Sequence, residues 1–312
     1  MNAWEMIGGD HGVEIEVRRL TASRVGPTVA VLGGVHGDEL EGVLACAMLA
    51  DGIDRILSGE LVIVPRSNPS ATQARMRESP NDGKNLARCF PGSPDGTYTD
   101  RIAHVLTNEV IARADALIDL HAGGEKYAMP FFAGYIGGLP SSQLAATMVA
   151  EFGAPVWWSH DSVNEGRTLS AAAALDVPAM YVEGGSGGRS LHHRDVDGYV
   201  NGVRRVLGSM GILAPSDGAP PERQVFIDGG DGNTDASIAT THPGYCVSAV
   251  AAGDRVAPGQ TIAEIRDRHG RLLVTITSPT NGIVMMIRTV AAVDAGDAIV
   301  MIAGLAKSGT DA

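Results

Sequence analysis

The chain has 312 residues, of which 44% are hydrophobic and 19% charged, a composition that supports a buried core and excludes a disordered polymer. Its 36 acidic residues outnumber the 24 basic ones and give a net charge of −12, which argues against nucleic acid or an anionic membrane as a partner. The three cysteines are far apart and form no C-x-x-C pair, so we expect neither a disulfide framework nor an all-cysteine metal site.

No segment has the composition of a targeting signal or a membrane span. The N-terminus, which begins MNAWE, has no basic region followed by an apolar region. No apolar stretch reaches the length of about 20 residues that a transmembrane helix needs. We therefore expect a cytoplasmic protein that has no membrane partner.

Strand-like and helix-like segments alternate through the first two-thirds of the chain. Short apolar runs predict buried strands at residues 28–32, 61–64, 116–120 and 179–182. Helical spacing of apolar residues predicts helices at 38–50, 100–113, 143–152 and 194–210. This alternation predicts an α/β fold in which helices flank a mainly parallel or mixed sheet.

A segment rich in proline and glycine, residues 214–222, has the composition of a linker. Beyond it the predicted strands are short, and a Gly-Asp turn before a short apolar strand occurs twice, as a weak internal repeat. We therefore predict two domains, 1–215 and an all-β domain at 224–306. The stretch 228–241, rich in Gly, Asp and Thr, is interpreted as an extended crossing or a mobile loop.

The strongest chemical signal is GGVHGDE at residues 33–39, which follows the first predicted strand and opens a helix. Residues three apart at a helix start face the same side, so His36 and Glu39 can bind one ion. Nitrogen and oxygen donors suit zinc, and the flanking glycines let the backbone approach closely. An isolated H-x-x-E is a weak signal, however, and the alternative is a helix cap with a solvent-facing glutamate.

A second histidine, His121, follows the third predicted strand in the sequence DLH. In open α/β sheets, sites form at the carboxyl ends of strands, so His121 and His36 are expected to face one cleft. Two histidines and a glutamate leave a fourth zinc position for water, whose pKa zinc lowers to about 7. Asp38, Glu41 and Asp119 are expected to surround this site rather than to bind the ion.

Two further elements follow the other predicted strands. Glu183 ends the fourth strand, where a carboxylate can take a proton from water and pass it to a leaving amine; the alternative is an ordinary strand-end acid. The loop after the second strand holds Asn68, Arg77 and Arg88. Arginines over a cleft suit carboxylate recognition or oxyanion stabilisation, and the alternative is a solvated basic loop.

Together these elements resemble the succinylglutamate desuccinylase/aspartoacylase family, a branch of the zinc carboxypeptidase superfamily. The matching pieces occur in the family's order and are GGVHGDELEG (33–42), SNPSATQARMR (67–77), NDGKNLARCFPG (81–92), IDLHAGG (118–124) and YVEGGSGG (181–188). The resemblance implies a zinc-carboxypeptidase-like fold with one zinc ion per subunit, held by His36, Glu39 and His121. It also implies that Glu183 is the general base and acid and that Arg77 stabilises the oxyanion and orients the substrate.

One position departs from the family's pattern. The family's loop usually reads Asp/Asn-Leu-Asn-Arg, where the second Asn and the Arg grip a substrate carboxylate, whereas this chain has NLAR at 85–88. Ala87 cannot donate a hydrogen bond, which removes a contact worth roughly 1–3 kcal/mol. Substrate binding is therefore assigned to Asn68, Asn85 and Arg88, and the substrate is expected to lack the usual α-carboxylate or to present it differently.

These features predict a zinc-dependent amidohydrolase that removes the acyl group from a small N-acylated amino acid or amine, at a carbon–nitrogen bond that is not a peptide bond. The alternatives are a metallocarboxypeptidase acting on short peptides and a metal-binding module without catalysis. The C-terminal domain resembles the small β-barrel that ends many family members and is similar to biotinyl and lipoyl carrier domains, but no Met-Lys-Met hairpin is present to carry biotin or lipoate. By analogy of fold, we expect it to shape the cleft mouth and to make contacts in a homo-oligomer.

Overall fold

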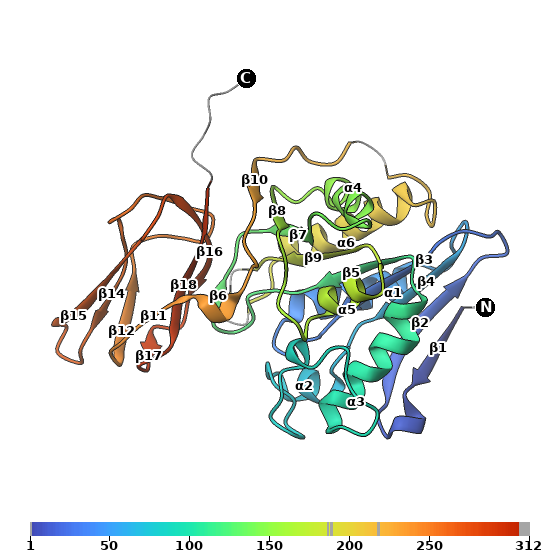
Figure 1. Ribbon diagram of the computed structural model, residues 1–312, viewed down its shortest axis with the longest axis horizontal. Helices are drawn as coiled ribbons and strands as arrows, with labels where there is room; N and C mark the ends of the chain where they lie inside the picture. The colour runs from blue at the N-terminus through green and yellow to red at the C-terminus, as the bar shows by residue number, and fades with distance from the viewer. Residues whose placement is uncertain (1, 186, 188–189, 217–218, 306–312) are drawn as a thin grey trace.

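A mixed sheet flanked by helices forms the larger part of the molecule, and the C-terminal strands lie to one side of it (Figure 1). The computed structural model describes residues 2–185, 187, 190–216 and 219–305, and within these ranges the large sheet has nine strands. In spatial order they are β1 (Asn2–Ile7), β2 (Ile15–Thr21), β4 (Glu60–Val64), β3 (Thr28–Gly33), β5 (Ala116–Leu120), β9 (Ala179–Glu183), β7 (Phe132–Ile136), β8 (Val156–His160) and β10 (Val225–Asp228).

The four strands predicted from apolar runs are all present and lie side by side at the centre of this sheet. β4, β3, β5 and β9 are parallel to one another, and all five residues of β5 are buried. Strands buried on both faces have continuous apolar sequences, which explains why they could be predicted. The antiparallel pairs β1–β2, β2–β4 and β7–β9 make the sheet mixed.

Helices cover both faces of the sheet. Against one face pack α1 (Leu40–Gly52), α4 (Ser142–Phe152) and α6 (His193–Ser209). The other face carries α3 (Tyr98–Val105), the π-helical turn η3 (Leu106–Val110), the 3-10 turn η4 (Ile111–Arg113) and α5 (Thr168–Ala174). The remaining short helical elements of the described residues are α2 (Pro69–Ala74) and the 3-10 turns η1 (Gly9–His11), η2 (Leu86–Arg88) and η5 (Thr234–Ala236). The helix predicted at 100–113 therefore begins at Tyr98 and changes to π and then 3-10 geometry in its second half.

The C-terminal part consists of two antiparallel sheets. One contains β11 (Ile238–Ala239), β18 (Ala298–Gly304), β16 (Gly282–Arg288) and β13 (Arg255–Val256). The other contains β15 (Leu272–Thr277), β14 (Thr261–Arg266), β12 (Gly244–Ser248) and β17 (Ala292–Val293). An apolar cluster that includes Ile262, Val284 and Val300 lies between them. The predicted fold class, an α/β sheet with a small all-β C-terminal part, is confirmed.

Two short strands hydrogen-bond across the two parts of the molecule. β10 was expected to belong to the β-domain at 224–306, but it pairs in parallel with β8 at the edge of the large sheet. β6 (Tyr127–Ala128), which follows β5, pairs with β16 of the C-terminal sheet. The division into domains at 1–215 and 224–306 stays a prediction. None of the helices described in the structure is both long and apolar enough to span a membrane.

Candidate active site

His36 and Glu39 lie in the tight connection between β3 and α1. Gly34, with a φ of 67°, turns the backbone away from the end of the strand. A Cβ on Gly37 would lie 2.0 Å from the carbonyl carbon of Ala71, so only glycine fits between this connection and α2. The glycines predicted to allow close backbone approach therefore fix the position of the two side chains.

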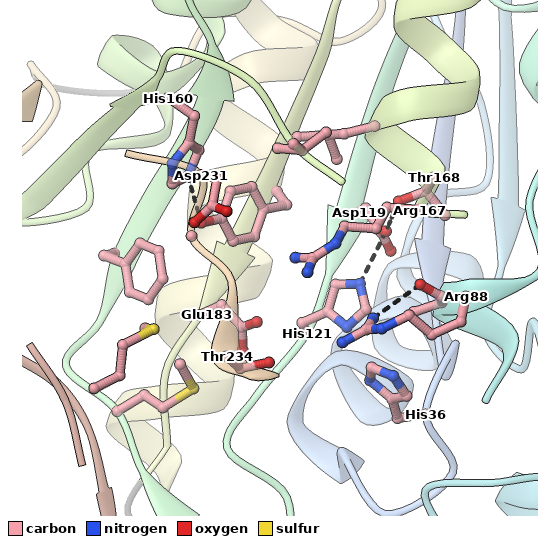
Figure 2. A pocket seen from close by; sticks show the side chains of 18 of the residues that line it. His36, Arg88, Asp119, His121, His160, Arg167, Thr168, Glu183, Asp231 and Thr234 are labelled. Carbon is pink, nitrogen blue, oxygen red and sulfur yellow. Dashed lines mark hydrogen bonds and ion pairs between the residues drawn. The ribbon is translucent and has the colours of Figure 1, made fainter. Parts of the chain in front are cut away.

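His121 leaves the end of β5, the strand next to β3 in the sheet. Asp119 lies two residues earlier, and alternation along a strand directs both side chains to the same side. Nε2 of His121 lies 2.9 Å from Oδ2 of Asp119, which also accepts a hydrogen bond from the Thr168 hydroxyl (Figure 2). The Tyr199 hydroxyl donates to the backbone carbonyl of His121 at 2.6 Å. Partners on three sides therefore hold this histidine in place.

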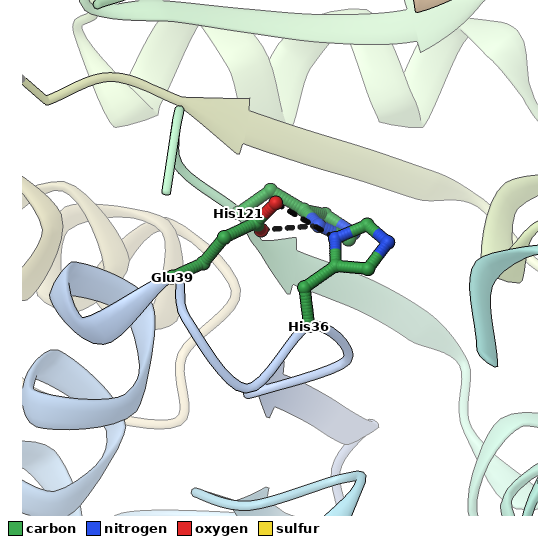
Figure 3. A group of neighbouring side chains, drawn as sticks. All are labelled: His36, Glu39 and His121. Carbon is green, nitrogen blue, oxygen red and sulfur yellow. Dashed lines mark hydrogen bonds and ion pairs between the residues drawn. The ribbon is translucent and has the colours of Figure 1, made fainter. Parts of the chain in front are cut away.

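The three predicted ligands meet around the Glu39 carboxylate (Figure 3). Nδ1 of His36 lies 2.7 Å from Oε1 of Glu39, and Nδ1 of His121 lies 2.8 Å from Oε2. One donor atom from each of the three residues lies within 4.8 Å of the other two. All three residues are buried. Residues distant in the sequence thus form one compact set of two nitrogen donors and one carboxylate.

This set fits a metal ion. Both imidazoles direct Nδ1 toward Glu39, while Nε2 of His36 lies 3.0 Å from Oδ1 of Asn85 and Nε2 of His121 contacts Asp119. A histidine ligand typically uses one ring nitrogen for the metal and donates the other to an oxygen. Nδ1 of His36 is buried and makes no well-oriented hydrogen bond with the residues described. Nitrogen and carboxylate donors suit zinc or a related divalent ion.

The charges of the three residues depend on one another. Burial raises the pKa of Glu39, but His36 and His121 outweigh it and hold that pKa well below its usual range. Burial and the Arg77 charge lower the pKa of His36 to about 4, so its imidazole is neutral at pH 7, as a ligand must be. Burial lowers the pKa of His121, whereas the carboxylates of Asp119 and Glu39 raise it above its ordinary value.

Glu183 and Arg77 reach the same place from two other elements. Glu183 is the last residue of β9, and its Oε2 is buried without a hydrogen-bond partner among the described residues. Burial and the negative charge of Glu39 raise the pKa of Glu183 well above its usual value. Arg77, which follows α2, donates from Nη1 to Oε1 of Glu39 at 3.0 Å, and its side chain is 35% exposed. Both residues therefore lie beside the proposed ligands.

A cavity brings most of these side chains together (Figure 2). His36, Arg77, Arg88, His121 and Glu183, all assigned from the sequence, line it. Further lining residues that the sequence analysis left unassigned are His160, Arg167, Tyr181 and Asp231. His160 ends β8, a strand that was not predicted, and Asp231 comes from the stretch interpreted only as a crossing or a loop.

The stretch from 229 to 237 crosses over this cavity on its way from β10 to β11. Nη2 of Arg88 lies 2.9 Å from Oδ2 of Asp235, and Nη2 of Arg167 donates to Oδ1 of Asn233 at 3.0 Å. Arg88 and Asp235 are 147 residues apart in the sequence. The structure therefore shows a crossing, and its polar side chains pair with two of the arginines that line the cavity, Arg88 and Arg167.

Two residues assigned to substrate binding have other contacts. Asn68 is fully buried, caps the start of α2 by accepting from the backbone N–H of Ala71 at 3.3 Å, and is absent from the described cavity lining. Asn85 directs Oδ1 at His36 and at the backbone N–H of Ala87. Arg88 alone of the three assigned residues lines the cavity, within the part of the chain described. Ser186 and Gly188 of the YVEGGSGG motif lie outside the described residues.

Known proteins share both the sequence pattern and this architecture. Residues 25–210 match the family described as the succinylglutamate desuccinylase/aspartoacylase catalytic domain. The chain is 31% identical over 288 residues to the N-alpha-acetyl-L-2,4-diaminobutyric acid deacetylase of Halomonas elongata, in an alignment that covers 91% of this chain and 84% of that protein.

Two solved structures are similar over almost the whole chain. A succinylglutamate desuccinylase from Silicibacter sp. TM1040 is 28% identical with a TM-score of 0.83, and the match covers 93% of this chain and 88% of that one. The product-bound ectoine utilization protein EutE from Ruegeria pomeroyi is 27% identical with a TM-score of 0.85, and the match covers 94% and 89% of the two chains.

Proposed function

Since the chain belongs to the succinylglutamate desuccinylase/aspartoacylase family, we propose that it hydrolyses the amide bond of a small N-acylated amino acid. The observation that carries this proposal is the meeting of His36, Glu39 and His121 beside Glu183, whose Oε2 has no hydrogen-bond partner among the residues that the structure describes. A metal-binding set and a proton-transfer group are the two elements that metal-assisted amide hydrolysis requires.

His36, Glu39 and His121 would hold one divalent ion per chain, which we propose is zinc. When bound, zinc would polarise the substrate carbonyl and make water more acidic. Asn85 and Asp119 orient the two imidazoles through their Nε2 atoms, so the ligand positions are set before any ion arrives.

Glu183 supplies the proton transfers in this proposal. Its carboxylate takes a proton from the attacking water and gives it to the nitrogen of the leaving amine. The raised pKa of Glu183 supports this role, because a carboxylate with a raised pKa is a stronger base than an ordinary one. The free Oε2 leaves a lone pair for the water molecule.

Arg77 supplies positive charge for the carbonyl oxygen as negative charge develops on it. Its ion pair with Glu39 holds the guanidinium beside the ligand set and leaves Nη2 and Nε for the substrate. Burial lowers the pKa of Arg77, but Glu39 and Asp38 outweigh it and raise that pKa above its ordinary value, so the guanidinium is charged at neutral pH.

A small substrate is favoured by what covers the cavity. The crossing at 229–237 contributes Thr234 to the lining, and β18 contributes Met301. These contacts support the proposal that the C-terminal β-domain shapes the mouth of the cleft. The 31%-identical relative is named for an acetylated diamino acid, so we propose Nα-acetyl-2,4-diaminobutyrate or a close analogue as the substrate.

The test is a panel of N-acetyl, N-succinyl and N-formyl amino acids given to the zinc-loaded protein, with its metal content measured in parallel. We expect hydrolysis by the wild type and at least a 100-fold lower kcat in Glu183→Gln, with zinc content unchanged. Glu165→Gln, an exposed glutamate, is the matched control and should keep wild-type activity. Full activity in Glu183→Gln, or zinc-loaded protein inert on the whole panel, would overturn the proposal.

A further inference from the structure

One carboxylate in the cavity has no part in the proposed chemistry. Asp231, on the crossing at 229–237, lines the cavity together with His160 and Tyr181. In Figure 2 it lies on the His160 side of the cavity, across from His36 and Arg88. We infer that Asp231 binds a free ammonium group of the substrate, so that the enzyme selects N-acylated diamino acids over those with neutral side chains. This inference rests on the proposed function and names its substrate class.

The charges around the cavity support this assignment. Each of its three arginines already has an oxygen partner, because Arg77 pairs with Glu39, Arg88 with Asp235, and Arg167 with the Asn233 amide. The charge of Asp231 acts on Arg167, where it opposes the lowering of the Arg167 pKa by burial, yet the two form no ion pair in the described part of the chain. Among the described residues that line the cavity, Asp231 is therefore a carboxylate that has no cationic partner and is left for a substrate cation.

The groups beside Asp231 also suit a cation. His160 is 1% exposed, and burial lowers its pKa to about 4, so the imidazole adds no positive charge at pH 7. Its Nε2 lies 2.7 Å from the Tyr181 hydroxyl. The rings of Tyr181 and Phe132 pack edge to face with centroids 5.6 Å apart, and both line the cavity. Aromatic faces attract an ammonium group, which a neutral imidazole does not repel.

A purely structural role for Asp231 accounts for only part of its side chain. Its Oδ1 accepts a hydrogen bond from the backbone N–H of Asn233 at 3.0 Å, the two-residue turn that Asp and Asn both form. Asn233 makes the same turn with the N–H of Asp235 at 3.1 Å, using an amide oxygen. The turn therefore requires an oxygen but no charge, and Asp231→Asn removes the charge while keeping the turn.

The experiment compares two substrates of the zinc-loaded protein that differ in one group. Nα-acetyl-2,4-diaminobutyrate ends its side chain in an ammonium group, and Nα-acetylnorvaline has a methyl group at the same place. We expect the wild type to favour the first by roughly 10- to 100-fold in kcat/KM, since a hydrogen bond to a charged group contributes that much. In Asp231→Asn this preference in kcat/KM should largely disappear, mainly because KM for the diaminobutyrate substrate rises. Asp228→Asn, the same change at the exposed last residue of β10, should keep it.

Calorimetric binding of the two released amino acids separates this inference from the proposed function, because binding needs no turnover. If wild-type protein binds 2,4-diaminobutyrate more tightly than norvaline and Asp231→Asn abolishes the difference, Asp231 is the ammonium site even when no amide is hydrolysed. Equal binding of the two amino acids by the wild type would overturn the inference. The inference would also be overturned if Asp231→Asn kept the preference for 2,4-diaminobutyrate, or if it bound both amino acids more weakly by the same factor.

Discussion

Nε2 of His121 lies 2.9 Å from Oδ2 of Asp119, two residues back along the same strand. Asp119 is fully buried and also accepts from the Thr168 hydroxyl, so the carboxylate cannot swing away. The contact fixes the imidazole with Nδ1 directed at Glu39, 2.8 Å away. The orientation of His121, a proposed ligand, is thus set by a residue that is not itself among the proposed ligands.

We therefore expect Asp119→Asn to weaken zinc binding by about 10- to 100-fold, the usual cost of losing a carboxylate behind a histidine ligand. The amide can still accept one hydrogen bond, so the protein should fold. Competition with a chelator of known affinity measures the effect. Asp51→Asn, an exposed change on α1, serves as the control, and equal zinc affinity in the two variants would contradict the prediction.

Gly37→Ala should damage both stability and metal binding. The added Cβ would lie 2.0 Å from the backbone of Ala71, and backbone cannot rotate out of the way as a side chain can. Overpacking of this kind costs about 1–3 kcal/mol or more in the free energy of unfolding, and here it separates His36 from Glu39.

Urea denaturation and zinc content together check this expectation. Gly9→Ala is the matched control, because a Cβ there meets nothing within 4 Å and the backbone has no positive φ. A Gly37→Ala protein that is as stable as Gly9→Ala and fully loaded with zinc would show that the connection before α1 is less tightly packed than described.

The pH dependence of activity should report Glu183. A general base works only when deprotonated, and burial together with Glu39 raises the pKa of Glu183 above its usual value. Activity should therefore fall as the pH is lowered through that raised pKa, although a bound divalent cation opposes the shift. kcat/KM profiles measured at constant zinc occupancy should show this acidic limb in the wild type. Its survival in Glu183→Gln would assign the limb to another group.

The ion pair between Arg88 and Asp235 should affect substrate binding more than it affects the stability of the fold. Asp235 is 63% exposed, and exposed pairs contribute about 1 kcal/mol or less to folding. Asp235→Asn should therefore leave the melting temperature nearly unchanged. Freed from its partner, Arg88 should bind a substrate carboxylate more readily, and KM for N-acyl amino acids should fall severalfold. Amides that lack a carboxylate serve as the comparison, because their KM should not depend on Arg88. If Asp235→Asn leaves the KM for N-acyl amino acids unchanged, Arg88 does not bind the substrate.

The fold could be predicted where local sequence decides it. β3, β4, β5 and β9 are buried on both faces, so their apolar runs are nearly continuous. β2 alternates apolar and polar residues, and β8 mixes aromatic and polar ones, so neither was recognised. β10 lies within the range predicted for the β-domain but pairs with β8. This pairing could not be foreseen, because the two strands are distant in the sequence and a strand's sequence does not identify its neighbour.

The same distinction applies to the site. His36, Glu39 and His121 were predicted because each lies in a motif at a strand end, where such sites form. Asn68 was assigned to substrate binding, which stays a prediction, although Asn68-Pro69 is also a helix-start signal, with a capping side chain followed by proline at the first helical position. Asp235 could not have been matched to Arg88, because 147 residues separate them and only the crossing brings them together.

The pairing of β6 with β16 has a practical consequence for anyone who divides this polypeptide. Tyr127 and Ala128 follow closely after His121 and hydrogen-bond to Arg288 and Ile287. A truncated protein ending before residue 224 would leave β6 without its neighbour and turn β8 into a bare sheet edge, which invites aggregation. Chimeras that exchange the last third of the chain should therefore carry matching versions of β6 and β10 with it.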